Sequence, residues 1–169
     1  MNQFWGKYRG IVVDNEDPLM LGRLNVTVPK ALGDVAVVWA MPCVPYAGLD
    51  VGFAMAPPIG AAVWVEFEGG DLDYPIWSGC YWRQGERPRD ASLPTVKLIK
   101  TAMCQLKLDD MPGEGGFTLS VADPAVPVPV TVRADTDGLS IVVGDIRLTI
   151  TGTGASINAE ISQQPAKTP

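Results

Sequence analysis

The second half of the chain repeats short runs in which apolar and polar residues alternate, yet it holds almost no aromatic residue. Residues 117–121, 139–143 and 146–150 each place an apolar side chain at every second position. A period of two puts the apolar side chains of a strand on one face. Residues 92–161 contain neither Trp nor Tyr, and Phe117 is their single Phe. One chain of this kind cannot cover its own apolar face.

Turns rich in Gly, Asp and Pro separate these runs, and regular short strands joined by tight turns are typical of a stacked β-prism or β-helix. A lone sheet would leave its apolar face and its edges exposed. We therefore expect three chains to pack around one axis as a homotrimer. The predicted strands are residues 96–108, 117–121, 128–132, 139–143, 146–150 and 155–161.

The aliphatic residues of these strands are the predicted oligomer interface, because they would fill the core along the axis. They are Leu98, Leu106, Leu108, Leu119, Leu139, Ile141, Val143, Ile146, Leu148, Ile150 and Ile157.

The first half has the pattern of a small barrel. Five runs suit short strands, and a stretch rich in Pro and Gly at residues 42–60 is expected to be a long loop. Every Trp and Tyr lies before residue 83, where they suit a barrel core or a protein contact. Five strands fit a barrel of the oligonucleotide/oligosaccharide-binding (OB) type. The strands are expected at residues 7–14, 22–28, 35–41, 62–67 and 74–81.

A charged segment with two prolines, residues 83–94, divides the halves and reads as a linker. The sequence thus predicts an all-β chain with a barrel at residues 1–82, a β-helical part at residues 95–162 and a polar C-terminal tail at residues 163–169.

Composition excludes several kinds of function. The chain has 13 basic and 19 acidic residues, spread so that neither half is basic, which argues against nucleic-acid binding. It has no His, so His-based triads, His-ligated metal sites and an imidazole pH switch are excluded. We expect no cofactor and no metal.

The N-terminus lacks a secretory signal, and no apolar run approaches the length of a membrane helix. We therefore expect synthesis in the bacterial cytoplasm. Cys43, Cys80 and Cys104 are odd in number and far apart, so they are expected to be small buried side chains rather than a disulfide framework.

Acidic residues at close spacing raise the alternative of a hydrolase or a calcium site. Glu66 with Glu68, and Asp71 with Asp73, stand two residues apart, as a carboxylate pair on one strand face would. They flank a Gly-Gly turn, and we interpret them as turn and strand-end charges. The Asp-X-Asp-Gly run at residues 135–138 lacks the downstream Glu of a calcium loop and is expected to be a tight turn.

Three blocks of the sequence resemble the phage baseplate assembly protein V / VgrG-like central spike family, which includes T4-like cell-puncturing spikes. The first block is Tyr-Arg-Gly-Ile-Val at residues 8–12, continued by Leu-Gly-Arg-Leu-Asn-Val at 21–26. The second, Glu-Phe-Glu-Gly-Gly-Asp at 66–71 followed by Pro-Ile-Trp at 75–77, resembles the core signature of the family. The third, at residues 97–110, resembles its first β-prism strands.

The resemblance covers about residues 5–160 and implies a structural, non-enzymatic membrane-piercing spike. Such a spike is a homotrimer below the hub of a contractile tail or injection machine, with an OB-fold collar and a triangular β-helix formed by three intertwined chains. It is incorporated in the virion or injection particle and pierces the target envelope without binding nucleic acid. The matching barrel residues are Gly22, Arg23, Trp39, Gly60, Trp64, Glu66, Phe67, Glu68, Gly69, Gly70, Asp71, Pro75 and Trp77.

Departures from the family pattern bear on the expected partners. The barrel begins within the first ten residues, so the resemblance implies a separate hub protein at the barrel. The linker is too short for the lysozyme domain of T4-like spikes. No His-X-His metal apex exists, so a PAAR-type tip protein is expected at the C-terminal end. The alternative is an OB-fold module that binds single-stranded nucleic acid or carbohydrate.

Overall fold

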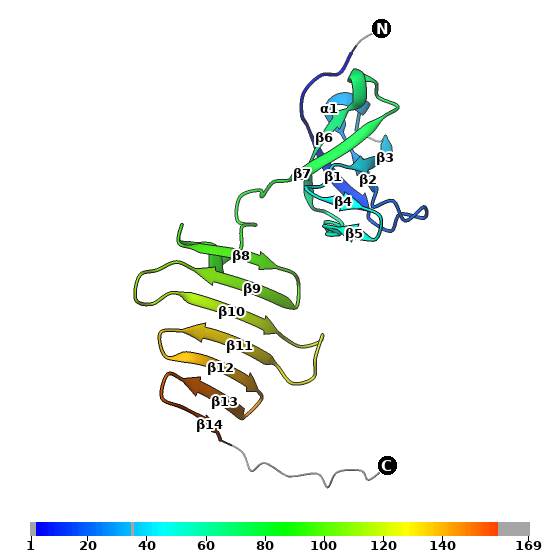
Figure 1. The fold of residues 1–169 in the computed structure, drawn as a ribbon. Helices are drawn as coiled ribbons and strands as arrows, with labels where there is room; N and C mark the ends of the chain where they lie inside the picture. Colours follow the sequence, from blue (N-terminus) through cyan, green and yellow to red (C-terminus); the bar gives the residue numbers. More distant parts are fainter. Residues whose placement is uncertain (1–2, 35, 159–169) are drawn as a thin grey trace, which may run out of the picture. The chain divides into compact units, whose positions relative to one another are not determined.

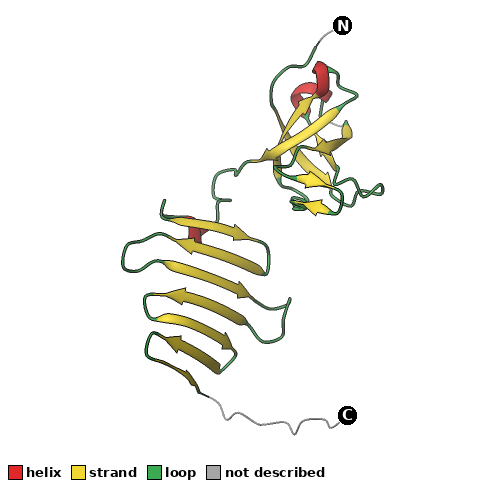
Figure 2. Ribbon diagram, viewed as in Figure 1, coloured by secondary structure: helices red, strands yellow, loops and turns green. Residues whose placement is uncertain are grey.

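A computed structural model describes residues 3–34 and 36–158, and shows two compact units, residues 1–86 and 87–169 (Figure 1). Their boundary falls inside the predicted linker at residues 83–94. The predicted tail at residues 163–169 and the last residues of the predicted strand at 155–161 lie outside the described residues. Strands dominate both units (Figure 2). The chain is all-β, and each unit is treated separately below.

The N-terminal unit is a closed barrel of five strands. Around the barrel the order is β1, β2, β3, β7, β6 and back to β1. All neighbours pair antiparallel except β3 and β7, which are parallel. Barrel strands numbered consecutively thus run 1-2-3-5-4, as in an OB fold. Their bounds are β1 Tyr8–Asp14, β2 Leu24–Thr27, β3 Val37–Pro42, β6 Ala62–Phe67 and β7 Pro75–Cys80.

Short elements occupy the connections of the barrel. Helix α1 (Pro29–Leu32) follows β2, and the 3₁₀ turn η1 (Glu68–Gly70) joins β6 to β7. The stretch expected as a long loop contains a small hairpin of β4 (Ala47–Gly48) and β5 (Val51–Gly52). The chain reverses at Leu49 and Asp50, where Asp50 has a φ of +57°, and composition alone did not locate this turn.

Alternating inward side chains of the strands build the barrel core. In β6, Val63 and Val65 are fully buried, while Trp64 between them lies on the outer face, as the period of two requires. Gly10 of β1 sits where a Cβ would come within 3.0 Å of the Thr27 carbonyl oxygen, so the strands approach closely there. The buried cluster is Val12, Leu24, Val26, Val28, Ala40, Val63, Val65, Phe67 and Trp77.

The C-terminal unit is one antiparallel sheet of seven strands in which each strand pairs with its sequence neighbours. The 3₁₀ turn η2 (Arg89–Ala91) precedes it and lies against its first strand. The strands are β8 Val96–Lys100, β9 Cys104–Asp109, β10 Gly116–Val121, β11 Val130–Asp135, β12 Gly138–Val143, β13 Ile146–Thr151 and β14 Gly154–Ile157.

The run predicted at residues 96–108 is two strands rather than one. A turn at residues 101–103 separates β8 from β9, and the Thr101 hydroxyl accepts the Cys104 N–H at 3.0 Å. Threonine forms such local turns because its hydroxyl competes for backbone donors.

One hairpin design occurs three times along one side of the sheet, after β9, β11 and β13 (Figure 1). In each, the side-chain oxygen of the last strand residue accepts the N–H two residues on: Asp109 from Met111 at 3.2 Å, Asp135 from Asp137 at 2.9 Å, and Thr151 from Thr153 at 3.3 Å. A glycine opens the next strand opposite that residue each time. The Asp135–Asp137 pair thus caps a tight turn.

Among the described residues, no helix is long and apolar enough to cross a membrane.

Candidate functional site: an assembly interface

Seven aliphatic side chains form an unbroken row across the C-terminal sheet. Register pairs Leu106 with Ile99 on one side and with Leu119 on the other. The row then continues to the last strand. Partners in register project to the same face, so these side chains are neighbours about 5 Å apart. From β8 to β14 the row is Ile99, Leu106, Leu119, Val132, Ile141, Leu148 and Ile157.

Two further rows flank it on the same face, two residues away along each strand. Apart from Lys97 in the first strand, every member is apolar or Cys. One row is Cys104, Val121, Val130, Val143 and Ile146, and the other is Lys97, Leu108, Phe117, Ala134, Leu139, Ile150 and Ala155. We call these three rows together the apolar face.

The opposite face of the sheet is polar. In its central row, Thr118 lies in register between Lys107 and Arg133, and Arg133 is in turn paired with Ser140. Two ion pairs on this face each join a basic residue to an acidic residue two positions on: Lys107 with Asp109 at 3.2 Å, and Arg133 with Asp135. The Asp137 N–H lowers the pKa of Asp135, and so does the Arg133 side chain, although partial burial acts in the opposite direction. This face suits contact with water.

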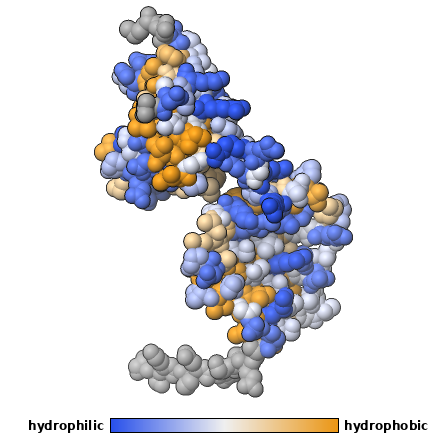
Figure 3. All heavy atoms as spheres, turned by 180° about the vertical axis from the view of Figure 1, so that it is seen from behind, coloured by the Kyte–Doolittle hydropathy of each residue, from blue (hydrophilic) through white to orange (hydrophobic). Residues whose placement is uncertain are grey.

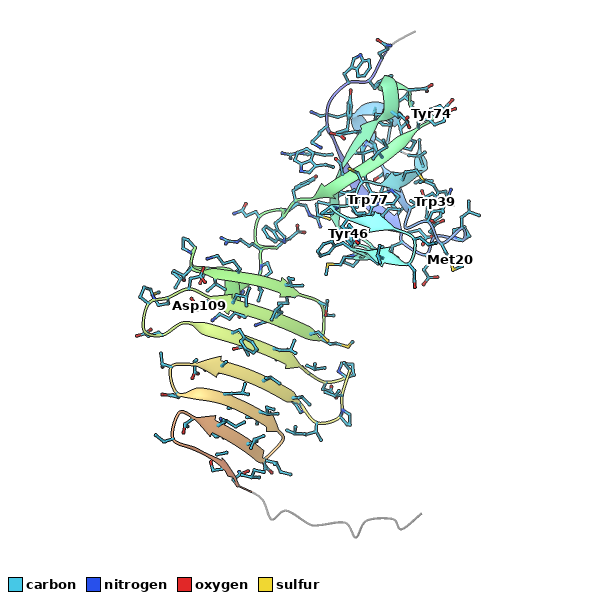
Figure 4. All side chains as sticks on the ribbon, in the orientation of Figure 1. Met20, Trp39, Tyr46, Tyr74, Trp77 and Asp109 are labelled. Atoms are coloured by element: carbon cyan, nitrogen blue, oxygen red, sulfur yellow. The ribbon has the colours of Figure 1, made fainter. Side chains whose placement is uncertain are left out.

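No residue from 92 to 158 is buried, although the apolar face spans all seven strands. Ile99 is 50% exposed, Leu119 44% and Ile146 52%. In the described part of this unit, no second sheet lies over the side chains drawn in Figure 4. Large contiguous apolar surfaces mark interaction sites, since leaving them in water is unfavourable. The apolar face is therefore a candidate assembly interface.

The structure brings ten of the eleven predicted interface residues together on the apolar face and places Leu98 on the other face. Leu98 pairs in register with Lys107, on the polar side. The reason is the unpredicted turn at residues 101–103, after which odd-numbered residues of β8 face even-numbered residues of β9. Ile99 therefore occupies the position on the apolar face that was predicted for Leu98. Thr101 was the sequence signal that could have revealed the turn.

The barrel residues that carry the resemblance are brought together in two groups. Arg23 forms an ion pair with Asp17 at 2.7 Å, and its guanidinium lies 5.2 Å from the centre of the Trp39 ring. The Trp77 indole N–H donates to the Gly22 carbonyl at 3.2 Å. These contacts fix the loop between β1 and β2 to the barrel.

The second group surrounds the Glu-Phe-Glu-Gly-Gly-Asp turn. Phe67 points inward and packs edge-on against Tyr8, with ring centres 5.5 Å apart. The Gly70 carbonyl accepts the Phe4 N–H at 2.9 Å, and a Cβ on Gly70 would come within 3.1 Å of that nitrogen. The signature thus closes this end of the barrel over the N-terminal segment. Pro75, which is buried, begins β7 after the turn.

The remaining signature residues lie at strand ends or on the outer face. Trp64 packs against Tyr81 with ring centres 4.7 Å apart, beneath the Arg9 guanidinium. The Gly60 N–H donates to the Val12 carbonyl at 2.8 Å in the turn before β6.

The paired carboxylates do not converge on a common point. Glu66 points outward from β6 to Lys7, 2.5 Å away, whereas Glu68 begins η1. The Asp71 carboxylate accepts the Asp73 N–H at 3.1 Å, which is a turn cap. In the described residues no group of three or more acidic, Cys or His side chains could hold a metal ion.

The prediction that the three cysteines are buried is wrong. Cys43, Cys80 and Cys104 are all exposed. Cys43 follows β3 and Cys80 ends β7, where the barrel stops covering side chains, and Cys104 stands on the uncovered apolar face. Counting cysteines does not reveal whether a residue sits at the end of a strand.

A closed five-stranded barrel with this strand order defines an OB fold, here joined to a sheet with an exposed apolar face. Comparison with protein families adds that residues 8–82 match the family described as the type VI secretion system/phage-baseplate injector OB domain. The match lies within the N-terminal unit and supports a structural baseplate role in general. Among curated proteins, no match was found.

Proposed function

We propose that the chain is the central spike of a contractile tail or injection machine, assembled as a homotrimer through the apolar face. The observation that carries the proposal is the combination of an injector OB domain with a seven-stranded sheet whose apolar face is left uncovered by residues 92–158. In this proposal each chain supplies one complete face of a triangular prism, because its strands already pair among themselves.

The physical advantage of such a prism is stiffness at small width. Three apolar faces turned inward form a continuous dry core, while Lys107, Arg133 and their acidic partners stay in water. Stacked strands leave free backbone edges only at the two ends of the sheet. A rod of this kind can transmit an axial push to an envelope without any enzymatic step.

The position in the particle follows from the family of the barrel. We propose that the barrel meets a separate hub protein and that a PAAR-type tip protein caps the end beyond β14. The chain is then part of the virion or injection particle after synthesis in the bacterial cytoplasm. The barrel supports this better than the nucleic-acid alternative, because residues 1–86 carry ten acidic and five basic side chains.

The chain offers its own test in Cys104, which belongs to the apolar face. In the native protein Cys104 should react with a maleimide at least about tenfold more slowly than Cys43, which is exposed on the barrel. In guanidinium chloride the two rates should converge. Peptide mass spectrometry measures both, and sedimentation velocity should show three chains per particle.

Equal reactivity of Cys104 and Cys43 in the native protein, or a stable monomer at micromolar concentration, would contradict the proposal. A stable dimer would instead indicate two apolar faces packed as a sandwich.

A further inference from the structure

A second apolar surface lies on the barrel. A groove of about 590 Å³ runs between the loop joining β1 to β2 and the β4–β5 hairpin, with Trp77 at its base. Figure 4 labels Met20 and Tyr46 on its two walls, and Figure 3 shows hydrophobic side chains gathered over part of the barrel surface. Of the described residues that line it, Asp50 is the one with a charge.

The first wall is a loop held rigid from within. The Asp17 carboxylate accepts the N–H groups of Leu19 at 3.0 Å, Leu21 at 2.8 Å and Arg23 at 3.1 Å, besides the Arg23 guanidinium. Its side chain is only 4% exposed. These bonds hold Met20, which is 92% exposed and has a φ of +52°, at the top of the wall.

The second wall is equally well ordered. The Phe53 N–H donates to the Tyr46 carbonyl at 2.9 Å, which closes the hairpin. A Cβ on Gly52 would come within 2.9 Å of that same oxygen, so the two strands touch without side chains between them. At the tip, Leu49 is 98% exposed and Asp50 has a φ of +57°.

Both walls therefore present large apolar side chains to water on fixed backbone. A non-glycine residue at positive φ costs stability, and it persists where the surrounding structure demands it, often at binding sites. A preformed site loses less conformational entropy on binding than a mobile one. Methionine side chains adapt to the shape of a partner. The groove has the properties of a docking site.

Charge indicates the partner. The charged residue that lines the groove is acidic, Asp50, and residues 1–86 carry ten acidic against five basic side chains. A second copy of this chain would bring the same excess of negative charge against it. We propose that the groove binds an apolar segment of a different protein, flanked by Lys or Arg. This inference rests on the proposed function in one respect, because the partner is then the component that meets the barrel in the assembled machine.

The probe is a library of random 12-residue peptides displayed on filamentous phage and selected on the full-length protein. Selected peptides should combine large apolar residues with net positive charge, and a synthetic consensus peptide should bind with a Kd that rises at least fivefold between 50 and 500 mM NaCl. The double variant Met20→Ser/Tyr46→Ser should bind it at least tenfold more weakly. Both side chains line the groove and are more than half exposed, so the barrel should still fold, as Trp fluorescence can verify.

Tyr74→Ser is the matched control. Tyr74 is 61% exposed, and Figure 4 places it at the opposite end of the barrel from Met20. It should leave the affinity unchanged. Peptides without a basic bias, or peptides that bind the double variant equally well, overturn the inference. Loss of trimers in the double variant would instead assign the groove to a second copy. A monomeric wild type that still binds the peptide refutes the proposed trimer and leaves the groove assignment standing.

Discussion

Leu119 lies in the middle strands of the apolar face, and its replacement tests the assembly most directly. It is 44% exposed in the single chain. Complete burial of a leucine stabilises by about 1.5–3 kcal/mol, so covering the exposed part contributes about 1 kcal/mol per chain. Over three chains Leu119→Ala should cost about 3 kcal/mol. This amounts to a factor of about 100 in the dissociation constant of the trimer.

Because that constant contains the square of the chain concentration, the concentration at which half of the trimers dissociate should rise about tenfold. Leu119→Asp should have a larger effect, since burying three unpaired carboxylates on one axis costs several kcal/mol for each. We expect it to leave a monomer at micromolar concentration. Sedimentation velocity over a series of protein concentrations measures both variants.

Thr118→Asp is the control, one residue away on the polar face. Register places Thr118 between Lys107 and Arg133, so a carboxylate there meets two basic side chains. Its trimer should be as stable as the wild type. The reasoning is refuted if Leu119→Asp assembles like the wild type, or if Thr118→Asp dissociates as readily as Leu119→Asp.

Three more predictions concern the folding of each unit. Leu24→Ala should lower the free energy of unfolding of the barrel by about 2–5 kcal/mol, because Leu24 is fully buried. Leu49→Ala, at a 98% exposed position, should change it by less than about 0.5 kcal/mol. Urea unfolding followed by Trp fluorescence reports on the barrel alone, since all five Trp precede residue 83. Gly138→Ala should lower the thermal unfolding midpoint of the sheet, measured by circular dichroism. Gly138 has a φ of +123°, and an added Cβ would overlap the Ile150 carbonyl oxygen. Gly152→Ala should leave the midpoint unchanged, because a Cβ there would meet nothing within 4 Å. The Arg23 guanidinium holds the pKa of Asp17 well below its usual range. The stability that the ionised Asp17 contributes is therefore present above about pH 4 and is lost as pH falls further. Asp17→Asn should show a smaller fall in thermal midpoint between pH 5 and pH 2 than the wild type, and an equal fall would contradict this.

Sequence periodicity predicted the strands well where turns carry Gly or Pro. The barrel strand at residues 62–67 has the predicted bounds, and the inward Val63 and Val65 with the outward Trp64 follow from the period of two. Periodicity failed at the turn of residues 101–103, which has neither Gly nor Pro, and the error moved Leu98 to the wrong face. The apolar face as a whole could be predicted, because the wrong assignment of odd- and even-numbered residues to the two faces affected one strand.

The groove on the barrel could not be predicted. Its walls depend on the hydrogen bonds of Asp17 and on the hairpin inside residues 42–60, neither of which leaves a periodic pattern. Large side chains such as Met20 and Tyr46 appear in the sequence as isolated loop residues. Only their fixed position on opposite walls shows that they act together.

The threefold recurrence of one hairpin design has a consequence for how such a sheet can change its length. Each of these hairpins begins and ends on the same side, so inserting or deleting a whole hairpin keeps every remaining side chain on its face. One hairpin adds two strand spacings, roughly 10 Å. Removing a single strand would reverse the chain direction and send all that follows to the other side. Length in this unit is therefore counted in steps of two strands, and related chains of different reach should differ by whole hairpins.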